Sequence, residues 1–443
     1  MQARRDGVAT TRATILRACA LALSLLVWGP ALAQAQPASV EGETVAYLPR
    51  AAVALARFGE GVAALLDDGR LVRVTDAGVR TLRHDLDSEV LVECVGALLA
   101  VDQRGRLVVG AYAPGTDRGS ARSRDDLPVG PPVSLHSTPL CLPDGGVVAI
   151  DPNGVWLLRL DAELLESSRA MLRPLPDGAP VWLGDGLVAL PVEATLRYRH
   201  GVLGDEVEAA GVAIVDAAEL RLLARWRTPG SRVIEDRRVV AFPAAGRWGV
   251  VATMSGGGDG GALVVLGARE GASTAGGPRL APIAVAPGIG QERRWRHTLG
   301  AADGRLYSVA TPHLGGPLER WTLPDLDSGQ LLLRRERFEL DVTSHRIGRR
   351  ELDLGALLPR GPGDPAGVDL LLLASRDLRA LRWIVCRPSG CAVAAVLELP
   401  TVLATSPVFW RDEGGGTTVW VALEDGALLR ARLPGDGILT QGE

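Results

Sequence analysis

Four cysteines in the body of the chain have the clearest potential chemistry: Cys94, Cys141, Cys386 and Cys391. Cys386 and Cys391 enclose the turn-like sequence RPSG, so they can meet across two strand ends, and we expect a disulfide between them. For Cys94 and Cys141 the sequence leaves two alternatives open, a disulfide or two buried thiols. A zinc half-site is disfavoured because no second ligand pair has suitable spacing, so no metal residue is predicted.

Local signatures of common catalytic sites are missing from the sequence. There is no GxSxG, no HExxH, no P-loop and no GxGxxG between a strand and a helix. The six histidines are dispersed along the chain, and none forms a close pair in sequence. We therefore predict no catalytic residue and no cofactor, although a site assembled from distant residues would leave no local motif.

The N-terminus predicts export. Residues 1–33 begin with Arg4 and Arg5, continue through the apolar stretch Ala18–Trp28 and end in Ala31-Leu32-Ala33. This order is typical of a cleaved signal peptide, and the apolar stretch is shorter than the roughly 20 residues that span a bilayer. We expect a periplasmic or extracellular protein with no transmembrane segment in its mature chain.

Charge argues against a nucleic-acid partner. The formal net charge is −4. The segment 1–33 carries four arginines and one aspartate, so its removal leaves −7. The chain has no lysine, but its arginines are scattered among Asp and Glu instead of forming a basic patch.

A repeated pattern indicates how the chain folds. Eight times an apolar run reaches an Asp/Gly or Gly-rich turn and restarts as a second apolar run, as in Val62–Arg73, Leu98–Val109 and Val419–Arg430. The repeat distance averages about 51 residues, which fits four-stranded propeller blades with loop insertions. The sequence therefore predicts an all-β propeller of four-stranded antiparallel blades, with eight blades, or seven as the alternative.

Residues 44–443 then form a single propeller domain after a short linker, 34–43. We expect Thr44–Leu48 to pair with the last blade and close the ring. Only Asp161–Leu172 suggests one or two helical turns. The tryptophans within apolar runs are expected to pack between blades.

Two long loops interrupt the repeat, and the strand order places both on one rim. Glu193–Ala210 expands a turn between the second and third strands of a unit, and Leu340–Gly367 expands a link between units. Loops on a rigid scaffold commonly carry binding residues, so we expect a binding rim here, with solvated loops as the alternative. The candidate residues on it are Tyr198, His200, His345, Arg349 and Arg350.

Two segments resemble the strand, Asp, turn, strand unit of PQQ-like β-propeller repeats: Val212–Trp226 and Leu323–Leu333. The turns at Gly69, Gly105 and Gly426 share this resemblance, which also extends to WD40-type propellers. It implies an exported propeller, either a quinoprotein dehydrogenase or a non-catalytic scaffold such as the outer-membrane assembly factor that holds partner proteins. The adjacent Cys-Cys pair of the dehydrogenases is absent here, so no catalytic residue is carried over.

Our first hypothesis is an exported, non-enzymatic propeller that acts as a binding or protein-interaction scaffold in the cell envelope. We expect it to be a monomer whose partner is a protein or an envelope-associated ligand. The competing hypothesis is a secreted propeller enzyme, namely a hydrolase, a lyase or a quinone-dependent oxidoreductase, with its site at the channel mouth.

Overall fold

The computed structural model describes residues 37–87, 89–113, 127–244, 247–269, 279–322, 332–360, 366–411 and 416–433. The chain divides into Met1–Pro37 and Ala38–Glu443, and the fold reported is that of the second unit by itself. The predicted signal peptide lies outside the described residues and stays a prediction. Within these ranges the chain forms β-strands and two short 3-10 helices, with no α-helix and hence no helix able to cross a membrane.

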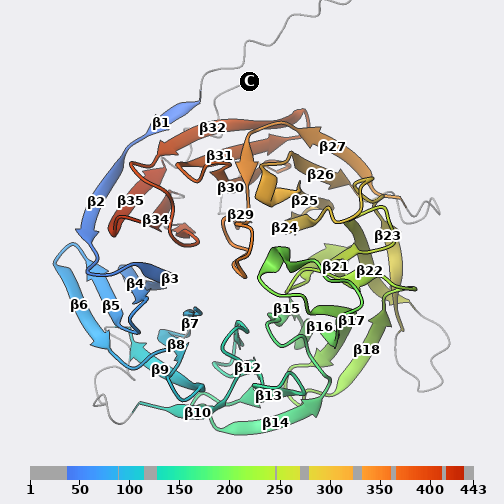
Figure 1. Ribbon diagram of the computed structural model, residues 1–443, viewed down its shortest axis with the longest axis horizontal. Helices are drawn as coiled ribbons and strands as arrows, with labels where there is room; N and C mark the ends of the chain where they lie inside the picture. The colour runs from blue at the N-terminus through green and yellow to red at the C-terminus, as the bar shows by residue number, and fades with distance from the viewer. Residues whose placement is uncertain are drawn as a thin grey trace, which may run out of the picture. The chain divides into compact units, whose positions relative to one another are not determined.

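Most strands form antiparallel meanders of four, each consecutive in sequence, that stand side by side around a centre (Figure 1). Four of these sheets are β3–β6 (Ala52–Phe58, Gly61–Leu66, Leu71–Thr75, Gly78–Arg83), β7–β10 (Val92–Cys94, Ala97–Val101, Arg106–Tyr112, Val129–Pro132), β11–β14 (Leu140–Cys141, Val147–Ile150, Trp156–Leu160, Glu166–Met171) and β24–β27 (Arg296–Ala302, Arg305–Ala310, Leu318–Thr322, Arg334–Phe338). This arrangement confirms the predicted all-β propeller of four-stranded antiparallel sheets.

A nine-stranded sheet contains two such meanders. They are β15–β18 (Val181–Gly184, Leu187–Thr195, Glu208–Asp216, Leu222–Arg227) and β20–β23 (Val240–Ala244, Arg247–Ser255, Ala262–Arg269, Arg279–Val285). The short strand β19 (Val233–Ile234) joins them by pairing with both β17 and β21. The described residues therefore contain seven hydrogen-bonded sheets, and the predicted number of blades stays a prediction because it depends on how this sheet is divided.

The N-terminal strands pair with the C-terminal end of the chain. Strand β2 (Gly42–Tyr47) is antiparallel to β35, in a sheet with β33, β34 and β35 (Val408–Arg411, Thr417–Ala422, Ala427–Leu433). Strand β1 (Ala38–Val40), inside the segment expected as a linker, runs parallel to β32. The sheet of β1 also holds β28–β32 (Val342–Thr343, Gly355–Leu357, Asp369–Ser375, Ala380–Arg387, Gly390–Glu398).

The hydrophobic core lies between neighbouring meanders. In one cluster Val62 and Val72 of the β3–β6 sheet pack with Trp420 of β34. In others Trp321 packs against residues of β21 and β22, and Trp383 packs with residues of β34 and β35. All three indoles are almost fully buried, which agrees with the expected packing role.

Two local predictions can be checked directly. The expectation of helical turns at Asp161–Leu172 is wrong, because Glu166–Met171 forms strand β14. The Asp161 carboxylate accepts hydrogen bonds from the backbone N–H groups of Glu163 and Leu165, which makes a tight turn in front of that strand. Both cysteine pairs form disulfides, Cys94–Cys141 with Cα atoms 5.3 Å apart and Cys386–Cys391 with Cα atoms 4.0 Å apart.

Candidate binding site at the insertion rim

The two long loops meet on one side of the propeller. The first insertion, 193–210, joins β16 to β17 and contains the 3-10 helix η2 (Gly201–Leu203). The second expected insertion, 340–367, is not a single loop. It contains β28 and β29, and Arg360 in its last part contacts Asp303 and Asp369 on the opposite side of the propeller. From here on, the second insertion means residues 340–354, the part that lies beside the first insertion. We call the side that carries them the insertion rim, and the opposite side, formed by the other turns of each meander, the turn rim.

Direct contacts hold the insertions together. The carbonyl oxygen of Val202 lies 2.9 Å from Nε2 of His345 and accepts the backbone N–H of Gly348 at 3.0 Å. Arg350 donates to the carboxylate of Asp205 at 3.1 Å. Beneath these contacts, Val202 and Leu203 pack with Leu352 and the fully buried Trp295.

The five candidate residues occupy different environments. Tyr198 and His345 are buried, His200 and Arg350 are half-buried, and Arg349 is exposed. The hydroxyl of Tyr198 has no hydrogen-bond partner among the described residues, and burial raises its pKa. Of the five predicted residues, two are therefore enclosed by the insertions, two are partly accessible and only Arg349 is exposed to solvent.

A cavity of about 530 Å³ lies beside the second insertion. Arg349 and Arg350 line it together with Arg346, Glu351 and Leu352. Its other lining residues include the apolar segment Ala51–Leu55 at the start of the β3–β6 sheet and acidic residues from neighbouring loops. An apolar wall combined with a few convergent charged groups is typical of a ligand or peptide site.

Arg237 fixes the loops around this cavity, and the sequence analysis missed it. Its guanidinium donates to the backbone carbonyls of Asp177, at 2.7 Å, and of His136 and Arg350. These three carbonyls belong to three different links of the propeller. The feature that could have drawn attention to it is the charged run EDRR, 235–238, between two apolar strands.

A carboxyl group next to Arg237 is poised near neutrality. Asp177 is 5% exposed, with an oxygen 3.3 Å from Arg237 and 3.7 Å from Arg350. Burial raises the pKa of Asp177 to about 6, despite the opposing effect of Arg237. Asp177 therefore keeps its proton to a higher pH than an exposed aspartate does.

Further buried carboxyl groups lie under the first insertion. Glu235 accepts a hydrogen bond from Ser255 and pairs with His200. Asp236 accepts hydrogen bonds from Trp295 at 2.7 Å and Thr253 at 2.8 Å, both neutral groups. Burial raises the pKa of Asp236 to about 7. Burial, followed by the charge of Glu235, raises that of Glu208 well above its usual value.

Three histidines that are distant in sequence lie close together here. His297 stacks on Trp295 with ring centres 5.4 Å apart, and His345 contacts the same indole edge-on at 4.9 Å. Burial lowers the pKa of His297 and His345, and it lowers that of His313 to about 4. Spacing along the sequence gave no sign of this cluster, since each histidine comes from a different loop or strand.

Among the described residues, no group of three or more His, Cys, Asp or Glu side chains is arranged to hold a metal ion. Most polar side chains of the insertion rim instead bond to one another and to backbone carbonyls. Their arrangement can orient loops and carry a protonation change.

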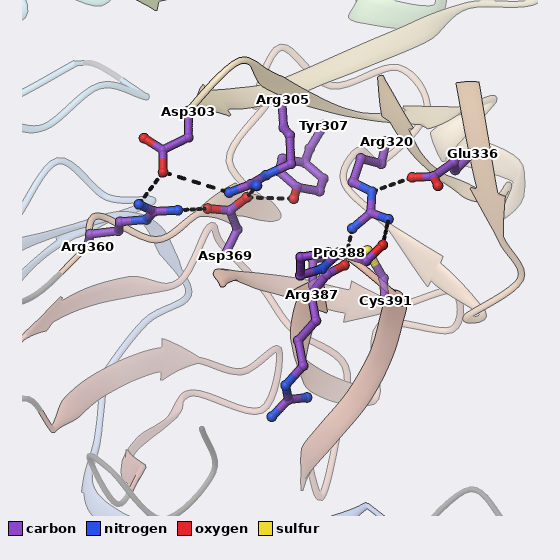
Figure 2. Close-up of polar contacts among 11 residues, drawn as sticks. Asp303, Arg305, Tyr307, Arg320, Glu336, Arg360, Asp369, Arg387, Pro388 and Cys391 are labelled. Atoms are coloured by element: carbon purple, nitrogen blue, oxygen red, sulfur yellow. Dashed lines mark hydrogen bonds and ion pairs between the residues drawn. A yellow bond between two sulfur atoms is a disulfide. The ribbon is translucent and has the colours of Figure 1, made fainter. Parts of the chain in front are cut away.

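The turn rim holds a different kind of polar network, between the β24–β27 sheet and the sheet of β30–β32 (Figure 2). The Asp369 carboxylate accepts hydrogen bonds from Arg305 at 2.7 Å, Tyr307 at 2.7 Å and Arg360 at 2.8 Å. Burial opposes its ionisation, but these three donors outweigh burial and lower its pKa. Nearby, Arg320 donates to the carbonyls of Arg387 and Pro388 in the turn closed by the Cys386–Cys391 disulfide.

Comparison with known proteins finds a likeness of fold. The chain matches no protein-family model and no curated protein sequence. Among solved structures it is similar to BamB from Moraxella catarrhalis (11% identity over 88% of this chain and 100% of that chain, TM-score 0.49). It is also similar to the computationally designed Ika8 protein (12%, 88% and 100%, TM-score 0.48) and to the quinohemoprotein alcohol dehydrogenase from Comamonas testosteroni (10%, 92% and 77%, TM-score 0.47). These are similarities of fold alone, and no function follows from them.

Proposed function

We propose that this protein is an exported, non-enzymatic β-propeller that binds a partner protein on its insertion rim. The supporting observation is the pairing of two insertions that fix each other in place beside a cavity of about 530 Å³. Loops already ordered before binding lose less entropy when a partner docks. The propeller acts as the rigid support, and the second insertion presents its side chains to the partner.

Arg349 is the best single probe of this surface. It is exposed and lines the cavity, and the electrostatic effect described for its side chain is on Glu351. Ile347, two residues earlier, is 65% exposed at the same tip. Arginine is among the residues that most often anchor protein interfaces, and the exposed apolar side chain of Ile347 adds area that a partner can bury.

Export is part of the same proposal, with a periplasmic or extracellular location. The two disulfides support it, because structural disulfides persist in oxidising compartments. We also propose a monomer that binds no nucleic acid, in line with the acidic net charge.

The test compares two charge reversals in affinity purification from envelope extracts followed by quantitative mass spectrometry. Arg349→Glu should lose specific partners, whereas Arg80→Glu, at an exposed site on strand β6, should keep them. Neither substitution removes a described side-chain hydrogen bond or ion pair, and circular dichroism of both variants checks that they fold; the described electrostatic effect of Arg349 is on Glu351. The proposal fails if both variants capture the same proteins as the wild type.

One observation favours the alternative of a secreted enzyme. Glu351 lines the cavity, and burial raises its pKa, as is common for general acids. A screen for hydrolase, lyase and quinone-dependent oxidoreductase activity decides this point. Turnover that disappears in Glu351→Gln would replace the scaffold function with catalysis.

A further inference from the structure

The imidazole of His345 makes two hydrogen bonds that one neutral ring cannot make together. Its Nδ1 lies 2.9 Å from the carbonyl oxygen of Glu351, and its Nε2 lies 2.9 Å from the carbonyl oxygen of Val202. A carbonyl oxygen only accepts, so each contact requires an N–H on the ring. Neutral imidazole has one N–H and the imidazolium ion has two. The observed geometry therefore fits the cation.

The two carbonyls belong to different insertions. Val202 lies in the 3-10 helix of the first insertion, and Glu351 lies in the second insertion together with His345 itself. The ring is 1% exposed and is held from the side by the edge-on contact with Trp295. Loss of one N–H group consequently removes either the bond to Val202, which joins the insertions, or the bond to Glu351, which orients the ring within the second insertion.

We propose that His345 is a proton-dependent link between the two insertions: the imidazolium form ties both carbonyls, and the neutral form ties only one. Acidification then fixes the first insertion to the second, and a rise in pH frees one side of the joint. This behaviour concerns the loops themselves and holds whether or not a partner docks on the insertion rim.

The groups that face His345 set the range of its titration. They are Arg237 of the link before β20, Arg346 and Glu351 of the second insertion, His297 of β24 and His313 of the 3-10 helix η3 (Pro312–Leu314). Burial, Arg237 and Arg346 lower the pKa of His345, and the two carbonyls raise it. The first effect is the larger, so the link titrates below the ordinary imidazole value of about 6.5.

The second contact to Val202 limits how far the joint can open. The backbone N–H of Gly348 also donates to the Val202 carbonyl, at 3.0 Å. The hydrogen bond from Arg350 to the Asp205 carboxylate does not depend on His345 either. Loss of the His345 bond therefore loosens the joint without separating the insertions. The expected effect is a change in local protection, not unfolding.

The experiment measures protonation and loop protection separately, on the whole protein. Histidine 15N NMR follows the charge state and tautomer of His345 from pH 4.5 to 8. Hydrogen exchange with mass spectrometry, corrected for the intrinsic pH dependence of exchange, follows peptides covering 201–206 and 346–350. We expect protection of both peptides to fall about fivefold to tenfold as the imidazolium signal disappears, the factor that corresponds to about one net hydrogen bond.

Two matched variants make the result decisive. His345→Gln has one side-chain amide group and no charge. In this variant the exchange protection of both peptides should therefore stay, at every pH, at the level that the wild type shows at high pH. His313→Gln changes a neighbouring histidine whose Nδ1 has no described partner, so the pH step should remain.

A pH step that survives in His345→Gln would overturn the proposal. So would protection that falls on acidification, because that would mean that the cation is expelled from its site. If His345→Gln does not fold, the wild-type NMR titration decides alone: a neutral His345 throughout the pH range in which both peptides stay protected would contradict it.

Discussion

On the turn rim, Asp369 is surrounded by two arginines and a tyrosine, whereas on the insertion rim Asp236 accepts its hydrogen bonds from the neutral groups of Trp295 and Thr253. Both aspartates are 2% exposed. Their pKa values nevertheless move in opposite directions, down for Asp369 and up to about 7 for Asp236. The charged donors of Asp369 therefore outweigh burial, whereas the neutral donors of Asp236 do not outweigh the burial of that carboxyl group.

The two rims also differ in their disulfides, because both disulfides lie on the turn rim. Cys94 and Cys141 lie at the ends of β7 and β11, and Cys386 and Cys391 face each other beside the turn between β31 and β32, all on the turn rim. The turn rim thus carries the two disulfides and the ion pairs of Asp369 with Arg305 and Arg360. The insertion rim instead carries buried carboxyl groups whose pKa is raised by burial.

The largest effect is expected from the disulfide between sheets. Replacing Cys94 and Cys141 by Ala should lower the free energy of unfolding by up to about 4 kcal/mol, because the bond closes a loop of 47 residues. The same change at Cys386 and Cys391 should cost up to about 2 kcal/mol, since that loop spans only 5 residues. Urea denaturation of both double variants checks the order, and equal losses would contradict it.

A second prediction concerns Asp369. Asp369→Asn should lower the stability at pH 7 by about 2–3 kcal/mol, because it leaves Arg305 and Arg360 without their buried carboxylate. A lowered pKa means that this stabilisation is present above the unfolded value of about 3.9 and is lost as pH falls through the folded pKa. The variant and the wild type should therefore converge in acid.

The matched control is Asp303→Asn. This aspartate belongs to the same network, pairing with Arg360, but its side chain is 54% exposed. Its substitution should cost less than about 1 kcal/mol. Similar losses at both positions would show that the network gains nothing from burial.

The same substitution at Asp236 should have the opposite effect. A raised pKa means that this group stabilises the fold fully below about 3.9 and that the contribution is lost as pH rises to about 7. Asp236→Asn removes this loss, so at pH 8 the variant should be about 1–2 kcal/mol more stable than the wild type. At pH 4 it should be about 1 kcal/mol less stable, because one hydrogen bond is weakened. Thermal unfolding at both pH values measures the change of sign.

The repeat of apolar runs was sufficient to predict the fold, because strand alternation and turn residues are local properties. It also located the insertion 193–210, since that loop interrupts the repeat. Within 340–367 it did not separate the strands β28 and β29 from the link, because both strands are short. The Arg237 contacts and the grouping of His297, His313 and His345 could not be predicted, because they depend on which loops become neighbours around the ring. Asp161 was misinterpreted because a capped turn and the first turn of a helix use the same kind of residue.

The pairing of β2 with β35 also constrains the order in which the protein can fold. Gly42 pairs in register with Ala431, so β2 cannot pair until the distant strand β35 has been made. Contacts of such long sequence separation slow folding and leave strand edges unpaired in the meantime. The edge of β2 therefore has to be kept from pairing with other chains until β35 has been made.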